Sequence, residues 1–280
     1  MLTAQQVEQY RRDGYLVVPG WAGPEQLQEM RQRAEELVDM FDPESISVFS
    51  TRNQSSTTDD YFLESASNVS FFFEEKAFDA EGKLRQPKGL SINKIGHAMH
   101  DLDPVFREFS RSSKISELMR DLGYRRPLPV QSMYIFKQPK IGGEVVAHQD
   151  STFLYTDPPS VTGIWIALED ATVHNGCLWT LPGSHIPGVQ RRFCREGRKL
   201  TFDKDPPAYD LDTFTPLPVK AGDLVVLDGA NVHYSHENSS PHSRHAYSVH
   251  YVEGTAEWAP QNWMQRRADL PFEPLYTLEG

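Results

Sequence analysis

The sequence predicts a mainly β domain, either a barrel or a sandwich, behind a helical N-terminal segment. From residue 128 onwards, short segments rich in β-branched and aromatic residues alternate with turns that contain glycine or proline, which is typical of these β folds. Before residue 128, apolar residues recur at helical spacing. A length of 280 residues is compatible with one such domain. We expect a single domain over 1–280, with a helical buttress at 1–127, a β core at 128–253 and a C-terminal extension at 254–280.

Helices are expected mainly in the N-terminal segment. Thr3 can cap a first helix at residues 4–12, and Pro24 suits the first turn of a longer helix at residues 24–40. Residues 104–122 predict two further short helices. We expect these helices to pack against the β core and not to take part in chemistry.

Two stretches between these helices have more than one interpretation. Residues 42–67 are polar and predict a surface loop, which could also fold over a substrate. The three phenylalanines at 71–73 predict a core strand, with pocket lining as the alternative. Lys94 lies among apolar neighbours, so its ammonium either extends to water or meets an anion. His97 and His100 have no carboxylate beside them at helical spacing, and we expect them to be structural.

The β core is expected to contain eight strands separated by turns. They lie at residues 130–137, 145–155, 162–168, 177–181, 214–219, 224–227, 232–235 and 244–252. An insertion at 187–213 interrupts this order. It contains a basic patch made of Arg191, Arg192, Arg195, Arg198 and Lys199. The basic patch is either a solvated surface or a lid over an anionic substrate.

The composition excludes several classes of protein. The net charge of −11 argues against non-specific binding to nucleic acid or to anionic membrane. No apolar run approaches the roughly 20 residues of a membrane-spanning helix, and the N-terminus lacks the regions of a secretory signal. The two cysteines, Cys177 and Cys194, indicate no disulfide framework and fit a reducing compartment. We therefore expect an intracellular, cytoplasmic protein that acts on a small molecule, of unknown oligomeric state.

A set of metal-ligand residues stands out in the β core. Residues i and i+2 of an extended strand face the same side, so His148 and Asp150 present an imidazole and a carboxylate together. His233 supplies a third ligand, and Arg244 follows it in the next predicted strand. Two histidines and one carboxylate form the facial triad of non-haem Fe(II) oxygenases. The same ligand set also suits zinc, as in zinc hydrolases.

Several motifs of the chain occur in a defined order. They are Ile92-Asn93-Lys94-Ile95-Gly96-His97-Ala98, Gln131-Ser132-Met133-Tyr134-Ile135-Phe136-Lys137-Gln138-Pro139, His148-Gln149-Asp150, Gly176-Cys177-Leu178-Trp179, Pro182-Gly183-Ser184-His185, Gly222-Asp223, His233-Tyr234-Ser235 and Arg244. Together they resemble the phytanoyl-CoA dioxygenase family over nearly the whole chain. The resemblance implies a double-stranded β-helix (jelly-roll, cupin-like) core that uses Fe(II), O₂ and 2-oxoglutarate as cosubstrate, with ascorbate as a stimulant.

The resemblance also implies roles for individual residues. By position, the iron ligands are His148, Asp150 and His233. The distal carboxylate of 2-oxoglutarate is held by Arg244 and Ser235. Four further residues match positions that shape the cosubstrate pocket, namely Lys94, Met133, Gln149 and Trp165. A guanidinium suits the distal carboxylate because it forms a bidentate pair that an ammonium cannot.

Other histidines compete for the third ligand position. They are His236, His242 and His245. His233 is preferred because it combines the matching motif with its spacing to Arg244, and Ser235 shares its face of the strand.

These roles predict an Fe(II)- and 2-oxoglutarate-dependent dioxygenase. It couples oxidative decarboxylation of 2-oxoglutarate to succinate and CO₂ with hydroxylation of an unidentified small molecule, with lipids and acyl compounds among the options. Similar halogenases lack the carboxylate ligand, so Asp150 favours hydroxylation. The alternatives are a barrel that binds 2-oxoglutarate without coupled turnover and a zinc hydrolase, in which Arg244 would have no role. An acidic chain suits a polyanionic acyl-CoA only if the basic patch faces the pocket.

Overall fold

A large sheet and a smaller sheet form the centre of the protein. The computed structural model describes residues 1–42, 47–51 and 59–278. Within these residues, the large sheet has eight strands, in the spatial order β1 (Tyr15–Val18), β13 (Leu224–Asp228), β8 (Thr162–Ala167), β15 (Ala246–Glu253), β5 (Pro127–Ile135), β4 (Ile92–His97), β3 (Val69–Glu74) and β2 (Val48–Phe49). The smaller sheet has the order β12 (Thr215–Leu217), β9 (Leu178–Thr180), β14 (His233–Ser235) and β6 (Val145–His148). Two ribbons, β10 (Phe193–Glu196) with β11 (Lys199–Phe202) and β16 (Glu257–Trp258) with β7 (Thr156–Asp157), lie beside the sheets.

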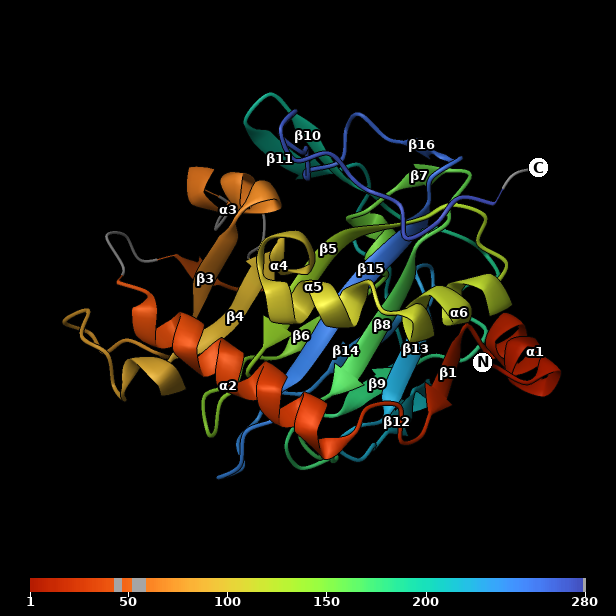
Figure 1. Cartoon of the computed structure of the whole chain (residues 1–280). Coiled ribbons are helices and arrows are strands. Elements are labelled where there is room, and N and C mark those ends of the chain that lie inside the picture. The colour runs from red at the N-terminus through yellow and green to blue at the C-terminus, as the bar shows by residue number, and fades with distance from the viewer. Residues whose placement is uncertain (43–46, 52–58, 279–280) are drawn as a thin grey trace.

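Helices cover the outer face of the large sheet. They are α1 (Ala4–Asp13), α2 (Pro24–Met40), α3 (Asp60–Glu64), α4 (Met99–Leu102), α5 (Pro104–Ser110) and α6 (Ser113–Asp121). In Figure 1, α2, α5 and α6 cross the face of the large sheet nearest the viewer, and the smaller sheet lies behind it. Thr3 and Gln6 form a capping box that starts α1, and Gly14 ends it in the left-handed conformation, at φ +78°. The predicted helices at 4–12, 24–40 and within 104–122 are confirmed.

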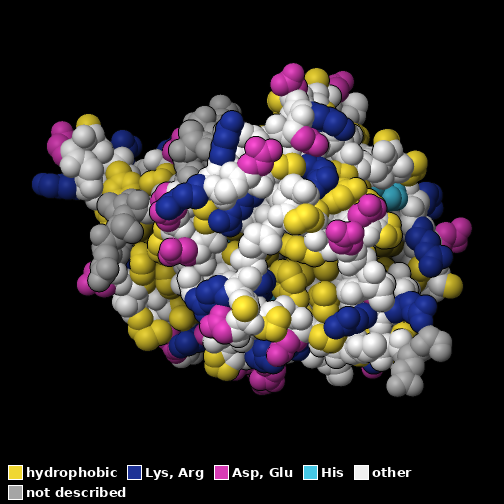
Figure 2. Space-filling model, turned by 90° about the horizontal axis from the view of Figure 1, so that it is seen from above, with side chains coloured by type: hydrophobic (Ala, Val, Ile, Leu, Met, Phe, Trp, Pro, Cys, Tyr) yellow, Lys and Arg dark blue, Asp and Glu magenta, His cyan; other side chains and the backbone are white. Residues whose placement is uncertain are grey.

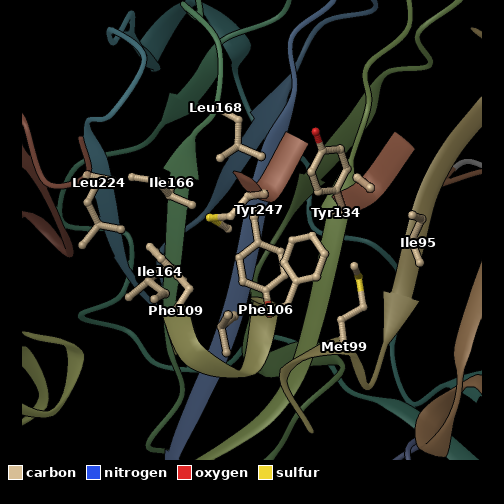
Figure 3. Packing of buried hydrophobic residues seen from close by; sticks show 14 of the residues in the cluster. Ile95, Met99, Phe106, Phe109, Tyr134, Ile164, Ile166, Leu168, Leu224 and Tyr247 are labelled. Atoms are coloured by element: carbon tan, nitrogen blue, oxygen red, sulfur yellow. The ribbon is translucent and has the colours of Figure 1, made fainter. Parts of the chain in front are cut away.

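The main hydrophobic core lies between the helices and the large sheet. Phe106 and Phe109 of α5 pack against Tyr247 of β15, with ring centroids 4.8 and 5.8 Å apart. Tyr134 of β5 joins the same cluster (Figure 3) and is fully buried. Because side chains alternate along a strand, Met133, the neighbour of Tyr134, points to the opposite face of the sheet. That face lines the cavity described below.

The N-terminal segment is less purely helical than predicted. β1, β2, β3 and β4 come from it and join the same large sheet as the C-terminal strands. The phenylalanines at 71–73 lie in β3, as expected, and all three are buried. Their strand is buried on both faces, so it shows a continuous apolar run and not an alternating pattern.

The two expected lid segments contain short regular elements. In the stretch 42–67, the described residues include β2, α3 and the 3₁₀ turn Ser65–Ser67, while residues 43–46 and 52–58 lie outside the described part of the chain. The insertion 187–213 folds into the β10–β11 hairpin and a 3₁₀ turn at Leu211–Thr213. Across the described ranges, no helix combines the length and the apolar character needed to cross a membrane.

Candidate metal centre

Two histidines meet across the smaller sheet. His148 at the end of β6 pairs directly with His233 at the start of β14, and their ring centroids are 4.4 Å apart. His148 Nδ1 donates to the carbonyl oxygen of Val146 (2.8 Å), and His233 Nδ1 donates to that of Asn231 (3.1 Å). Each Nδ1 therefore carries the proton, and each Nε2 keeps a lone pair for a metal.

Asp150 completes the group. Its Oδ1 lies 3.6 Å from His148 Nε2 and 3.7 Å from His233 Nε2. One ligand atom from each of the three residues lies within 4.8 Å of the others, and they are the only such group among the described residues. Burial raises the pKa of Asp150, but the charges on His250 and His233 outweigh it and hold the pKa well below its usual range. Burial also lowers the pKa of His233 to about 4, so its ring is neutral at pH 7 and can bind a metal without losing a proton.

The backbone at Asp150 differs from the prediction. The expected strand at 145–155 is wrong beyond His148, because β6 ends there and Asp150 opens a 3₁₀ turn, Asp150–Thr152. The carbonyl oxygen of Asp150 accepts hydrogen bonds from Phe153 N and Leu154 N, which bends the chain. The carboxylate consequently reaches the two histidines from a turn and not from the face of a strand.

His250 is a residue of this site that the sequence interpretation missed. Its Nε2 lies 3.2 Å from Asp150 Oδ2, the carboxylate oxygen not directed at His148 and His233. Gly163 pairs with His250 across β8 and β15, and a Cβ at Gly163 would lie 3.0 Å from Asp150 Oδ2. The missing side chain thus leaves the space that Asp150 occupies. The position of His250 on the cavity face of a predicted strand was the available signal.

A cavity of about 750 Å³ opens beside the three residues. Both sheets line it, the smaller one through His148 and His233 and the large one through β4, β5, β8 and β15. Figure 2 looks down on the side of the protein where α3 and the β10–β11 hairpin lie. Hydrophobic side chains gather in the middle of that face, and charged side chains surround them. The cavity is large enough for a small-molecule ligand.

One end of the cavity is built to hold an anion. Arg244 is 1% exposed and lines the cavity. Its Nε donates to the carbonyl oxygen of Gly176 (3.1 Å), its guanidinium carbon lies 5.1 Å from the Trp165 ring centre, and its Nη1 has no partner among the described residues. Burial lowers the pKa of Arg244 to about 10, which leaves it charged at pH 7. An unpaired buried guanidinium N–H is costly unless a ligand accepts from it.

Ser235 and Lys137 lie at the same end. Lys137 Nζ donates to Ser235 Oγ (2.8 Å) and to the carbonyl oxygen of Gly143 (2.6 Å). The sequence interpretation missed Lys137, although it continues the alternation of Met133 and Ile135, which also line the cavity. The prediction that Arg244 lies in a strand is wrong. β15 begins at Ala246, and Arg244 is held in the preceding loop by its backbone N–H, which donates to the carbonyl oxygen of Lys137.

Lys94 lies on β4 in an aromatic cage. Its Nζ is 3.4 Å from the Phe49 ring centre and 5.2 Å from that of Phe72. Met133 Sδ is 3.9 Å away. Burial lowers the pKa of Lys94 to about 7. The interpretation as a surface lysine is therefore wrong, and Lys94 lines the cavity together with Met133 and Trp165.

Gln149 and the other histidines lie elsewhere. The Gln149 amide donates to the carbonyl oxygens of Gly188 and Ala230 and accepts from Gln190 N, so it anchors the start of the insertion and is absent from the cavity lining. Three expected competitors or spare ligands, His100, His242 and His245, are absent from the cavity wall, whereas His97 and His236 line it without joining the group of three ligands. His97 ends β4, so the expected helical spacing to His100 is wrong.

The basic patch is split by the fold. Arg191 lines the cavity and stacks on Phe202 at 3.9 Å. Arg192 stacks on Tyr155 at 4.1 Å, outside the cavity wall. Arg198 pairs with Asp60 on the surface. The patch as a whole is therefore not a lid, and Arg191 is its one member on the cavity wall among the described residues.

Residues 10–246 match the family model described as phytanoyl-CoA dioxygenase (PhyH). The chain belongs to this family. A phytanoyl-CoA dioxygenase of Arabidopsis thaliana is 55% identical over 278 residues, which cover 99% of this chain and 98% of that one. Phytanoyl-CoA dioxygenase domain-containing protein 1 of Mus musculus is 46% identical over 288 residues and 99% of both chains. Family membership makes the protein a dioxygenase.

Solved structures share the fold at low sequence identity. The α-ketoglutarate-dependent carbocyclase SnoK, from nogalamycin biosynthesis, has a TM-score of 0.67 at 21% identity, covering 100% of this chain and 94% of its own. EctD from S. alaskensis, crystallised with 2-oxoglutarate and 5-hydroxyectoine, has a TM-score of 0.67 at 18% identity, covering 100% of this chain and 88% of its own. The likeness extends over the whole chain, so no large part of this fold is foreign to that of these oxygenases.

Proposed function

We propose that the protein is an Fe(II)- and 2-oxoglutarate-dependent dioxygenase, a single domain with a jelly-roll core, that hydroxylates a small molecule. The observation that carries the proposal is the convergence of His148 Nε2, His233 Nε2 and Asp150 Oδ1 on one point. Two neutral imidazoles and one carboxylate fit a facial triad, which leaves open metal positions for a cosubstrate and O₂. The backbone hydrogen bonds of both Nδ1 atoms fix the rings in that orientation.

The anion-binding end of the cavity supports 2-oxoglutarate as the cosubstrate. We infer that Arg244 Nη1 and the Ser235 hydroxyl bind its distal carboxylate, since Arg244 has an unsatisfied buried donor and Ser235 already accepts from Lys137. Trp165 and Met133 form the walls beside them, and Lys94 adds a second positive group. Bound iron and 2-oxoglutarate would supply O₂ activation and the oxidising power for C–H hydroxylation. The residues of the chain orient both ligands and exclude water from them.

The structure also bears on the alternatives. A carboxylate lies within reach of both histidines, so the position that a halogenase leaves for halide is filled by Asp150. A zinc hydrolase would share the three ligands but would leave the buried guanidinium of Arg244 unsatisfied. Gln149 has all its observed contacts with backbone groups, and we assign it the positioning of the insertion and not the binding of cosubstrate.

The proposal predicts iron-dependent turnover of 2-oxoglutarate by the purified protein. With Fe(II), ascorbate and O₂, we expect slow release of succinate and CO₂ even before a substrate is added, and none when Zn²⁺ replaces Fe(II). Succinate is measured by chromatography, and CO₂ release from 1-¹⁴C-labelled 2-oxoglutarate provides an independent readout. Binding of 2-oxoglutarate without succinate formation would favour the non-catalytic alternative. Failure to bind it at all would refute the proposal.

Arg191 is expected to contact an anionic part of the substrate. It is half-buried in the cavity wall, and burial lowers its pKa from the usual value, so replacing its charge should matter inside the cavity. Arg191→Glu should leave the slow uncoupled succinate release intact and remove its stimulation by the active fraction of a metabolite extract. Lys199→Glu makes the same charge change at an exposed position of the insertion and should retain stimulation. Stimulation that survives in Arg191→Glu would exclude this contact.

A further inference from the structure

A row of three polar side chains crosses the cavity wall at a distance from the anion-binding end. The polar row consists of His97 on β4, Gln131 on β5 and His250 on β15, which are adjacent strands. Gln131 pairs directly with His250, and His97 pairs with the residue next to Gln131. Along the chain, His250 lies six residues beyond Arg244, or roughly 20 Å of extended backbone. The polar row is therefore separate from the groups assigned to 2-oxoglutarate.

The hydrogen bonds of the row leave acceptor nitrogens unused. The Ser65 hydroxyl donates its one proton to the carbonyl oxygen of Phe62 (2.5 Å), so at 2.7 Å it must accept from His97 Nδ1. His97 Nε2 is then an acceptor. His250 donates from Nε2 to Asp150 Oδ2 at 3.2 Å, and its Nδ1 is buried without a partner in the described part of the chain. Burial holds the pKa of His97 well below its usual value, as do the charges of Lys94 and His250, so its ring stays neutral.

Apolar side chains enclose the polar row. The rings of Phe62 and Trp263 lie 5.5 and 5.2 Å from the His97 ring, and both residues line the cavity. Leu154 lines the same region. An imidazole acceptor favours a hydrogen-bond donor and repels a carboxylate, while the nearby Lys94 disfavours an ammonium. A hydroxyl group satisfies both conditions, since it can donate to His97 Nε2 and accept from the Gln131 amide.

We propose that the polar row binds a hydroxyl group of the substrate, and that the substrate is a small molecule with a hydroxyl on an apolar, ring-containing body. This inference rests on the proposed function, because it places that molecule next to Asp150 and hence next to the iron. His250 links the two, since it touches both the carboxylate ligand and the pairing position of Gln131. Hydroxyl recognition by acceptor nitrogens in a dry site gives selectivity, because an analogue without the hydroxyl leaves them unpaired.

The test compares two probes that differ only in a hydroxyl group. The dissociation constants of 2-phenylethanol and ethylbenzene are measured by ligand-observed NMR, on protein loaded anaerobically with Fe(II) and 2-oxoglutarate. The ratio of the two constants is the readout. We expect His97→Phe to lower the preference for 2-phenylethanol about ten-fold relative to the unmodified protein. His97→Gln keeps an acceptor and should restore most of the preference. His174→Phe, at an exposed histidine, should leave the ratio unchanged.

An unchanged ratio in a folded His97→Phe protein would overturn the inference. If that variant does not fold, Gln131→Leu supplies the same comparison, and an unchanged ratio there would also overturn it. Repeating the titrations on metal-free protein separates the two proposals. A hydroxyl preference that depends on His97 in a protein that never consumes 2-oxoglutarate would refute the proposed function and leave the polar row intact. Succinate formation without any hydroxyl preference would do the reverse.

Discussion

Asp150→Ala is expected to abolish the iron-dependent decarboxylation of 2-oxoglutarate. Asp150 supplies the only carboxylate of the three-residue group, and its pKa lies well below the usual range although burial alone would raise it. Loss of the anionic ligand should lower the affinity for Fe(II) by more than about a hundred-fold, since even loss of an outer contact to a metal ligand costs roughly ten- to a hundred-fold. Iron affinity is measured by anaerobic titration, and turnover by succinate release.

Two further variants separate the loss of the ligand from a loss of folding. Asp150→Asn keeps the shape of the side chain and a hydrogen-bond partner for His250 but lacks the charge, so it should fold normally and still show little turnover. Asp205→Ala removes a carboxylate from an exposed position and should behave like the unmodified protein. Thermal unfolding of all three is followed by circular dichroism. Undiminished decarboxylation in a folded Asp150→Ala protein would refute the assignment of Asp150 as an iron ligand.

The grouping of the candidate ligands was predictable from the sequence, but its backbone was not. His148, Asp150 and His233 could be singled out because their residue types and motif order are restrictive. The strand expected at 145–155 failed because an apolar run of five to ten residues does not reveal where a chain turns, and the turn at Asp150 depends on the distant Gly163. Arg244 was placed in the wrong element for a similar reason, since its loop is fixed by a long-range contact with Lys137.

Residues that complete the site through tertiary contacts were missed. Lys137 and His250 carry no motif of their own, and each gains its place from the partner it meets across a sheet, Ser235 and Asp150 respectively. Strand alternation would have put both on the cavity face, but it does not say what lies opposite. The N-terminal strands were underestimated because strands buried on both faces lose the alternating pattern that marks a half-buried strand. Gln149 shows the converse error, since a residue between two ligands points away from them.

Arg244→Lys is expected to weaken 2-oxoglutarate binding while iron binding stays near that of the unmodified protein. The lysine would lose the Nε contact to Gly176 and could not form a bidentate pair with the distal carboxylate. Losing such a charge-assisted pair costs about 1.5–3 kcal/mol, or roughly ten- to over a hundred-fold in affinity. The dissociation constant of 2-oxoglutarate is measured by anaerobic calorimetry, and the apparent KM by succinate release. Arg266→Lys is the matched control, because Arg266 is also buried but pairs with Asp101 away from the cavity; it should lower the melting temperature without changing either constant. Equal losses of iron and 2-oxoglutarate binding in Arg244→Lys would mean instead that Arg244 stabilises the fold, since a side chain that acts only on the distal carboxylate has no means of changing metal affinity.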